Sequence, residues 1–152
     1  MEITKIPNKL LAKKMEKIAI DDIKKGLCKD LISNMRVAMV ENNGVGLAAN
    51  QAGKDLSIFV IDKKLAEKNN VPDAFINPEI TEYSREREET EEGCLSIPDY
   101  WVPIKRAKKI KIKFIDENGI KQKIKARGFL ARVLQHETDH LNGLTIKDKV
   151  KP

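Results

Sequence analysis

The feature that most constrains this chain is QHETDH, the short motif at residues 135–140. It contains the pattern HExxH, and its His136 and His140 are the only histidines in the chain. Residues four apart share one face of a helix, so both imidazoles could bind one metal ion, with Glu137 beside them as a base. The motif therefore predicts a metal-binding helix near the end of the chain.

The sequence around the motif supports a helix from about residue 129 to residue 142, followed by Gly143 as a stop signal. Its apolar stripe consists of Leu130, Val133, Leu134 and Leu141. An earlier helix is expected over residues 22–41, with Asp21 or Asp22 as its N-cap. Its apolar positions recur every four residues, at Ile23, Leu27, Leu31, Met35 and Met39.

Extended segments are expected between these two helices. LSIFVID (56–62) has the pattern of a buried strand, DAFINPEI (73–80) that of an extended segment around Pro78, and EREETEEG (86–93) that of a solvated strand or loop. Alternating residues on both sides of Glu117-Asn118-Gly119 predict an antiparallel hairpin. The predicted fold class is therefore α+β, with an N-terminal helix and antiparallel sheets packed around a central HExxH helix, in a single domain over residues 1–152.

The formal net charge of +6 is compatible with a polyanionic partner, but the lysine pattern favours a solvated surface. Lysines alternate with apolar residues in KKIKIKFIDENGIKQKIKAR, as on the wet face of a hairpin. The stretch lacks the aromatic interleaving that a single-strand binder uses for base stacking, so no specific nucleic acid is expected. No apolar run approaches a membrane span, and the first residues lack a signal-peptide core. A cytoplasmic location without membrane contact is the expectation.

The metal site needs a third ligand, and no third histidine exists. Asp148 is the only acidic residue beyond Asp139, so a downstream ligand is poorly supplied. Cys94 in EEGCLSIP is the better candidate, because Gly93 lets the backbone approach closely and a metal would hold the thiol as a thiolate. A set of one cysteine and two histidines leaves a fourth position for water, which is typical of catalytic sites.

The two cysteines also have plainer interpretations. Cys94 could be a buried structural cysteine in a strand, and Cys28 is expected to pack as a small apolar residue on the first helix. Two cysteines in a chain without an export signal are expected to be free thiols.

A second motif, GVGLAANQ at residues 44–51, follows the first predicted helix. Its two glycines indicate backbone that lies close to a ligand. A phosphate-binding loop is a weaker interpretation, because GK[ST] is absent and the motif follows a helix instead of a strand. A helix C-cap and turn is the remaining alternative.

Together the three segments resemble the peptide deformylase family, whose motifs have the forms GxGLAAxQ, EGCLS and QHExDHLxG. This chain has GVGLAANQ (44–51), EGCLS (92–96) and QHETDHLNG (135–143) in the same order. The resemblance implies metal-dependent hydrolysis of the N-formyl group from N-formylmethionine of newly made proteins, with release of formate. It also implies one divalent metal ion, with Fe(II) as the native ion and zinc, nickel or cobalt able to occupy the site.

The resemblance assigns roles to individual residues. It implies Cys94, His136 and His140 as metal ligands, Glu137 as general base, and the Gln51 side chain with the Leu95 backbone N–H as donors to the oxyanion. It implies that Gly44, Val45 and Gly46 bind the substrate, with Gly46 at the peptide backbone and Val45 in the pocket for the methionine side chain. Glu92 is expected to anchor the loop around the second motif, with Arg106 as its basic partner.

Three departures from the family pattern limit this transfer. Asn50 stands where proline is typical, a change that could loosen the turn but leaves Gln51 in place. Trp101 stands where many members have an arginine near the entrance, so peptide contacts beyond the first residue could differ. The C-terminal tail is short, so any ribosome contact is expected to be weak. The alternatives are an HExxH metallopeptidase and a non-catalytic relative that binds the ribosome or a metal.

Overall fold

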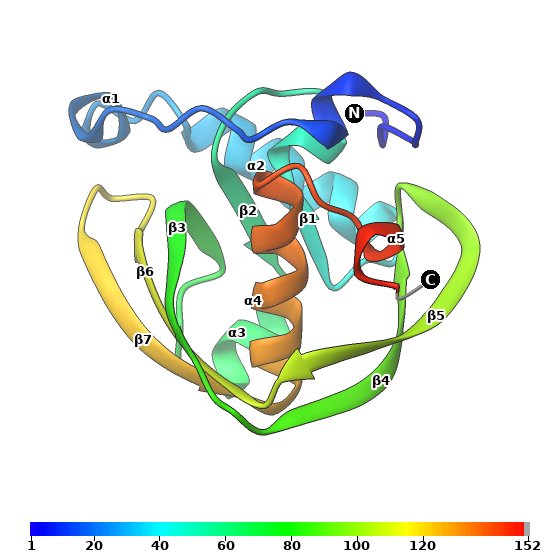
Figure 1. Cartoon of the computed structure of the whole chain (residues 1–152). Coiled ribbons are helices and arrows are strands. Elements are labelled where there is room, and N and C mark those ends of the chain that lie inside the picture. Colours follow the sequence, from blue (N-terminus) through cyan, green and yellow to red (C-terminus); the bar gives the residue numbers. More distant parts are fainter. Residues whose placement is uncertain (151–152) are drawn as a thin grey trace.

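The computed structural model describes residues 1–150, and a single long helix lies at its centre. This helix, α4 (Gly128–Leu141), is enclosed by two antiparallel sheets (Figure 1). The five-stranded sheet has the order β1 (Gly46–Ala48), β2 (Ile58–Ile61), β3 (Ala74–Tyr83), β6 (Lys109–Ile115) and β7 (Lys121–Arg127). The two-stranded sheet pairs β4 (Arg87–Cys94) with β5 (Ile97–Ala107). The α+β prediction, with sheets around the HExxH helix, is confirmed.

Shorter helices cover the outside of this arrangement. α2 (Lys29–Glu41) packs on the sheet opposite α4, and α5 (Ile146–Lys149) packs on β4 and β5. The remaining helical segments are η1 (Lys9–Ala12), α1 (Ile20–Lys24), η2 (Ala49–Ala52) and α3 (Lys63–Lys68). Among residues 1–150, no helix combines the length and the apolarity that crossing a membrane requires.

β2 is buried on both faces, and its side chains divide between the two large helices. Phe59 and Ile61 belong to the apolar cluster around α4, whereas Ile58 and Val60 belong to the cluster around α2. Successive side chains of a strand point to opposite faces, so a strand between two helices must be apolar at every position. The prediction of a buried strand over 56–62 is confirmed for this reason.

The β6–β7 hairpin shows the predicted alternation. Ile110, Ile112 and Phe114 are buried against the α4 cluster, while the lysines between them are exposed. Asp116 closes the turn, because its Oδ1 atom accepts hydrogen bonds from the backbone N–H groups of Asn118 and Ile120. The expected segment around Pro78 also forms a strand, β3, and residues 86–93 form most of the exposed strand β4.

The prediction of one continuous helix over 22–41 is wrong. α1 ends at Lys24, Gly26 adopts a φ of 79°, and α2 begins at Lys29. The left-handed conformation of Gly26 interrupts the four-residue repeat, so Leu27 points outward and is 67% exposed. Ile32 takes a core position instead. The predicted end of the helix is confirmed, with Asn42 as the C-cap of α2.

The expected cap of the first helix is also wrong. Ala19 is the N-cap of α1 without a side-chain bond, and Asp21 and Asp22 lie in the first turn, where carboxylates favour the helix dipole. Cys28 is buried, but it lies at the N-cap of α2 and not within a helix. Both cysteines are free thiols, as predicted.

A pair of leucine substitutions tests this assignment of core and surface. Leu134 is fully buried in α4, so Leu134→Ala should lower the free energy of unfolding by about 2–5 kcal/mol. Leu27→Ala, at the exposed position, should change it by no more than about 0.5 kcal/mol. Urea denaturation of both variants measures the difference, and equal losses would contradict the break between α1 and α2.

Candidate metal centre

α4 holds both histidines in a helix that is buried on almost every side. Leu130, Val133, Leu134 and Leu141 are buried as predicted, and the helix bounds match the expected range to within one residue at each end. His140 is 1% exposed and Glu137 is 3% exposed. Polar side chains at such positions need partners from other elements, because their burial is otherwise costly.

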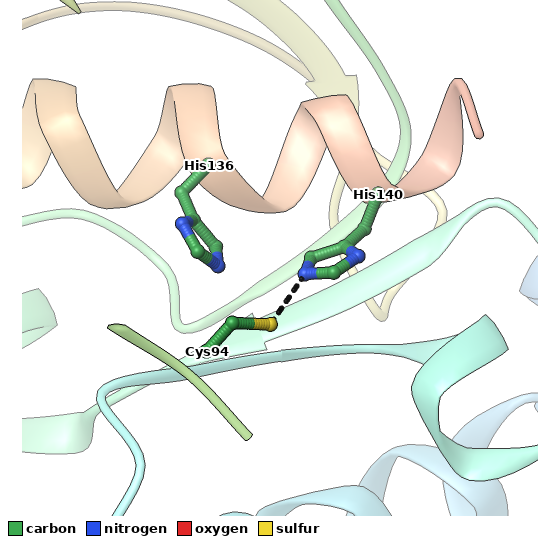
Figure 2. Close-up of side chains that lie close together, drawn as sticks. All are labelled: Cys94, His136 and His140. Atoms are coloured by element: carbon green, nitrogen blue, oxygen red, sulfur yellow. Dashed lines mark hydrogen bonds between the residues drawn. The ribbon is translucent and has the colours of Figure 1, made fainter. Parts of the chain in front are cut away.

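Cys94 reaches the histidines from the end of β4. The pairing of β4 with β5 shifts register between Gly93 and Cys94, and the chain reverses so that Cys94 pairs with Ile97. Figure 2 shows the thiol and the two imidazoles converging from opposite sides. The Sγ atom of Cys94 lies 3.2 Å from Nε2 of His140, and the ligand atoms of all three residues lie within 4.8 Å of one another.

These three donors could hold one metal ion. One thiolate and two imidazoles suit a tetrahedral ion with one position left open. Cys94, His136 and His140 form the one such group of at least three potential ligands within residues 1–150. Cys94 is therefore the candidate for the third ligand, as the sequence indicated.

A pocket of about 620 Å³ opens over this cluster. Every predicted site residue except the deeply buried His140 lines it. The predicted residues that do so are Gly44, Val45, Gly46, Gln51, Cys94, Leu95, His136 and Glu137. Three motifs that lie far apart in the sequence thus contribute to one cavity.

Gly46 allows Glu137 to reach the pocket. A Cβ atom at position 46 would lie 2.6 Å from Oε2 of Glu137, closer than real side-chain contacts allow. The glycine in the first motif is therefore required by the carboxylate in the third. The same carboxylate oxygen lies 3.9 Å from Nε2 of His136, beside the cluster of Cys94 and the two histidines.

Gln51 connects the first motif to the cysteine. Its Nε2 donates to Oγ of Ser96 at 3.2 Å and lies 3.5 Å from Sγ of Cys94. Its Oε1 accepts a hydrogen bond from the backbone N–H of Ala48 at 3.0 Å. The bond from Ala48 fixes the orientation of the amide, so that its N–H groups face the cluster.

A buried carboxylate holds His136 from behind. Oε1 of Glu92 lies 2.9 Å from Nδ1 of His136, and Arg106 donates two hydrogen bonds to Glu92, at 2.6 and 2.9 Å. Arg106 also donates to Asp139 at 2.8 Å, so it bridges the strand and the helix. The predicted partnership of Glu92 and Arg106 is confirmed as a contact. A carboxylate on the second ring nitrogen orients a metal-binding histidine.

These contacts set the protonation of the site. Burial alone would raise the pKa of Glu92, but hydrogen bonds from His136 and Arg106 outweigh it and hold the pKa at about 2. Burial raises the pKa of Glu137 to about 7, against the attraction of His136 and Arg106. Burial opposes a charge on His136, yet Glu137, Cys94 and Glu92 raise its pKa to about 10. The anionic groups around His136 therefore favour a positive charge at this position, and a divalent metal ion would also supply one.

Some contributors were not expected from the sequence. Arg132 donates to Glu92, to the carbonyl of Ile104 and to the carbonyl of Glu88. It precedes His136 by four residues, so helical spacing could have placed it on the same face. Ser96 was missed as the partner of Gln51, and a single hydroxyl in a loop gives no such signal.

Asn50 and Trp101, the two residues that depart from the family pattern, both lie close to the site. Asn50 is fully buried and donates to the carbonyl of His140 at 2.6 Å, so the turn is held and not loosened. Trp101 is 68% exposed at the rim of the pocket, and its ring lies against Gly93, where a Cβ atom would approach it to 2.8 Å. A side chain at position 93 would therefore displace the indole from its position on the neighbouring strand.

The fold and the site define a class of protein: an HExxH helix enclosed by antiparallel sheets, with a cysteine beside its two histidines. Comparison with known proteins gives the family. The family model for polypeptide deformylase matches residues 1–152, and the chain belongs to this family. The chain is 49% identical over 152 residues to the peptide deformylase of Dictyoglomus turgidum, covering 98% of this chain and 92% of that one.

Solved structures agree with this assignment. The crystal structure of peptide deformylase from Thermotoga maritima matches with a TM-score of 0.89 at 40% identity, covering 99% of this chain and 97% of that chain. A Met-Ala-Ser-bound class I type b peptide deformylase from Acinetobacter baumannii matches with a TM-score of 0.88 at 29% identity, covering 99% and 98%.

Replacing the buried carboxylate tests the network behind His136. Glu92→Gln would leave Arg106 and Arg132 facing a neutral amide, so the free energy of unfolding should fall by about 3–5 kcal/mol. Urea denaturation measures this loss. Glu88→Gln is the control, because Glu88 is exposed and bonds Arg132 only through its backbone. An equal effect of both substitutions would contradict the role of the buried charge.

Proposed function

We propose that this chain is a peptide deformylase that hydrolyses the N-formyl group of peptides beginning with N-formylmethionine. The products are formate and a peptide with a free amino terminus. The observation that carries the proposal is that Cys94, His136, Glu137 and Gln51 line one pocket, with His140 beside Cys94 beneath it, in a chain from this family. The 152 residues would act as one catalytic domain.

Cys94, His136 and His140 are proposed to hold one divalent metal ion. The donor atoms are close enough together to share an ion, and their chemistry suits zinc, nickel, cobalt or Fe(II). Fe(II) is proposed as the native ion, following the family resemblance. When bound, such an ion lowers the pKa of water and polarises a carbonyl group, which an unreactive amide needs.

Glu137 is proposed as the proton carrier. Its carboxylate is buried beside His136, and its pKa of about 7 lets it accept and release a proton near neutral pH. It would take a proton from the attacking water and give it to the departing amine. The amine then leaves as a neutral group while formate is released.

Gln51 and Leu95 are proposed to stabilise the negative charge that develops on the formyl oxygen. The Gln51 amide faces the cluster with its N–H groups, and Leu95 directly follows Cys94 at the pocket wall. One donor aimed at such an oxygen typically contributes about 2.7–4 kcal/mol to the lowering of the barrier.

The peptide is proposed to lie extended between two strand edges. Within residues 1–150, β1 is the terminal strand of its sheet and β4 pairs with β5 alone, and residues of both strands line the pocket. Unpaired strand edges bind extended peptides through backbone hydrogen bonds. Gly44 and Gly46 would lie against the peptide backbone, and Val45 would contact the methionine side chain. The A. baumannii relative was solved with Met-Ala-Ser, a peptide of the product class.

The setting of the reaction is also a proposal. N-formylmethionyl nascent chains are the proposed partners, in the cytoplasm, with at most weak contact with the ribosome. No specific nucleic acid and no membrane are proposed as partners.

Two other functions have less support. An HExxH metallopeptidase would draw its third ligand from a downstream residue, whereas the cluster within residues 1–150 uses Cys94. A non-catalytic relative would have no need of a buried base. Glu137 and Gln51 both face the pocket, which favours the enzyme.

Formate release tests the proposal directly. Protein loaded with Fe(II) under anaerobic conditions should release formate from formyl-Met-Ala-Ser. Glu137→Gln should bind the metal as tightly as the wild type but lose turnover by about 10²–10⁴-fold, because only the proton carrier is removed.

Two measurements decide the outcome. Metal content must be matched between wild type and variant, and formate must be measured on both. No formate from fully loaded wild-type protein would contradict the proposed activity, and full turnover by Glu137→Gln would contradict the role of the carboxylate.

A further inference from the structure

The short helix η2 carries two adjacent amide side chains that reach different halves of the cluster. Gln51 lies 3.5 Å from Sγ of Cys94 and donates to Ser96, on the strand side. Asn50 donates to the backbone carbonyl of His140 at 2.6 Å, on the helix side. η2 therefore bridges the segment that carries the thiol and the helix that carries the imidazoles.

The bond from Asn50 is isolated from solvent and fixed in direction. Asn50 has no exposed surface, and its Nδ2 also points to the carbonyl of Leu10 at 3.4 Å. Both neighbours are hydrogen-bond acceptors, so a reversed amide would bring its oxygen against two carbonyl oxygens. The nitrogen must therefore face His140. The same carbonyl accepts a hydrogen bond from the backbone N–H of Gly143 at 3.0 Å, so Asn50 adds a side-chain hydrogen bond to the end of the helix.

The two histidines are held in different ways. The ring of His136 is fixed through Nδ1 by Glu92 at 2.9 Å. Nδ1 of His140 is buried, and no group within residues 1–150 forms a hydrogen bond with it. The position of the His140 ring thus depends on its backbone, and its Nε2 lies only 3.2 Å from Sγ of Cys94. A small shift of this backbone would change the spacing of the donors.

We propose that Asn50 is a positioning residue, which fixes the backbone of His140 and thereby the distance between the His140 imidazole and the Cys94 thiol. The inference rests on the proposed metal ligation by Cys94, His136 and His140. Asn50 neither lines the pocket nor belongs to the ligand cluster, so it would act through the helix end. Together with Gln51, it makes η2 the element that holds the two sides of the cluster together.

Zinc affinity, measured by competition with a chelator, tests the proposal. Asn50→Ala should bind zinc about 10- to 100-fold more weakly than the wild type, as is usual when a group that orients a ligand is removed. The absorption spectrum of the cobalt-loaded variant should change as well, because it reports the geometry of the donors. The variant should also lose kcat while its KM for formyl-Met-Ala-Ser stays unchanged.

Asn77→Ala is the matched control. Asn77 is also an asparagine that ties down a backbone segment by two hydrogen bonds, to the carbonyl and from the N–H of Ile18, at 2.8 and 2.9 Å. It lies on β3 and does not line the pocket. Its loss should lower the stability to urea but leave the zinc affinity and the cobalt spectrum unchanged.

The outcomes are distinct. Wild-type zinc affinity in Asn50→Ala, or an equal loss in Asn77→Ala, would overturn the proposal. Should Asn50→Ala fail to fold, Asn50→Leu keeps the volume and removes the donor, and failure of both would assign Asn50 to the fold and not to the site. If the wild type binds zinc tightly but releases no formate, the proposed activity fails and the positioning role of Asn50 stands.

Discussion

The structure depends on the burial of a helix that is not apolar. α4 fills the space between the two sheets and carries Arg132, His136, Glu137 and His140 into the interior along with its leucines. Each of these polar groups needs a partner, because burial removes water from it. The surrounding elements provide partners for most of them: Glu92 for Arg132 and His136, Cys94 for His140 and Asn50 for the helix end. The Oε1 atom of Glu137 is the exception, since it is buried without a hydrogen bond from residues 1–150. The fold and the site are therefore one set of interactions.

Glycines and buried charges occur where the segments that form the site contact one another. Gly46 leaves room for the carboxylate of Glu137, and Gly93 leaves room for the ring of Trp101. Arg106 links Glu92 on β4 to Asp139 on α4, which connects the second motif to the third. Breaking one side of such a buried pair leaves an uncompensated charge, so these residues constrain one another even though they lie far apart in the sequence.

Much of this could be predicted from local patterns. The alternation in β6 and β7 and the four-residue spacing in α4 follow from the geometry of strands and helices, and both were expected correctly. The break between α1 and α2 was not expected, because the four-residue repeat continues in the sequence through Gly26 and Leu27. The contacts of Arg132, Ser96 and Asn50 depend on segments brought together only by the tertiary fold, so no local pattern reveals them. Cys94 could be predicted beside the histidines because no third histidine exists and Asp148 is the only acidic residue beyond Asp139, and the structure brings its thiol to them.

The central claim is that Cys94 completes a metal centre with His136 and His140. X-ray absorption spectroscopy of the zinc-loaded protein tests it most directly. The expected result is one sulfur ligand at about 2.3 Å with nitrogen ligands at about 2.0–2.1 Å. The sulfur signal should disappear in Cys94→Ser and persist in Cys28→Ser, since Cys28 is packed in the core cluster around α2. A wild-type spectrum without sulfur, or a sulfur signal that survives in Cys94→Ser, would contradict the account.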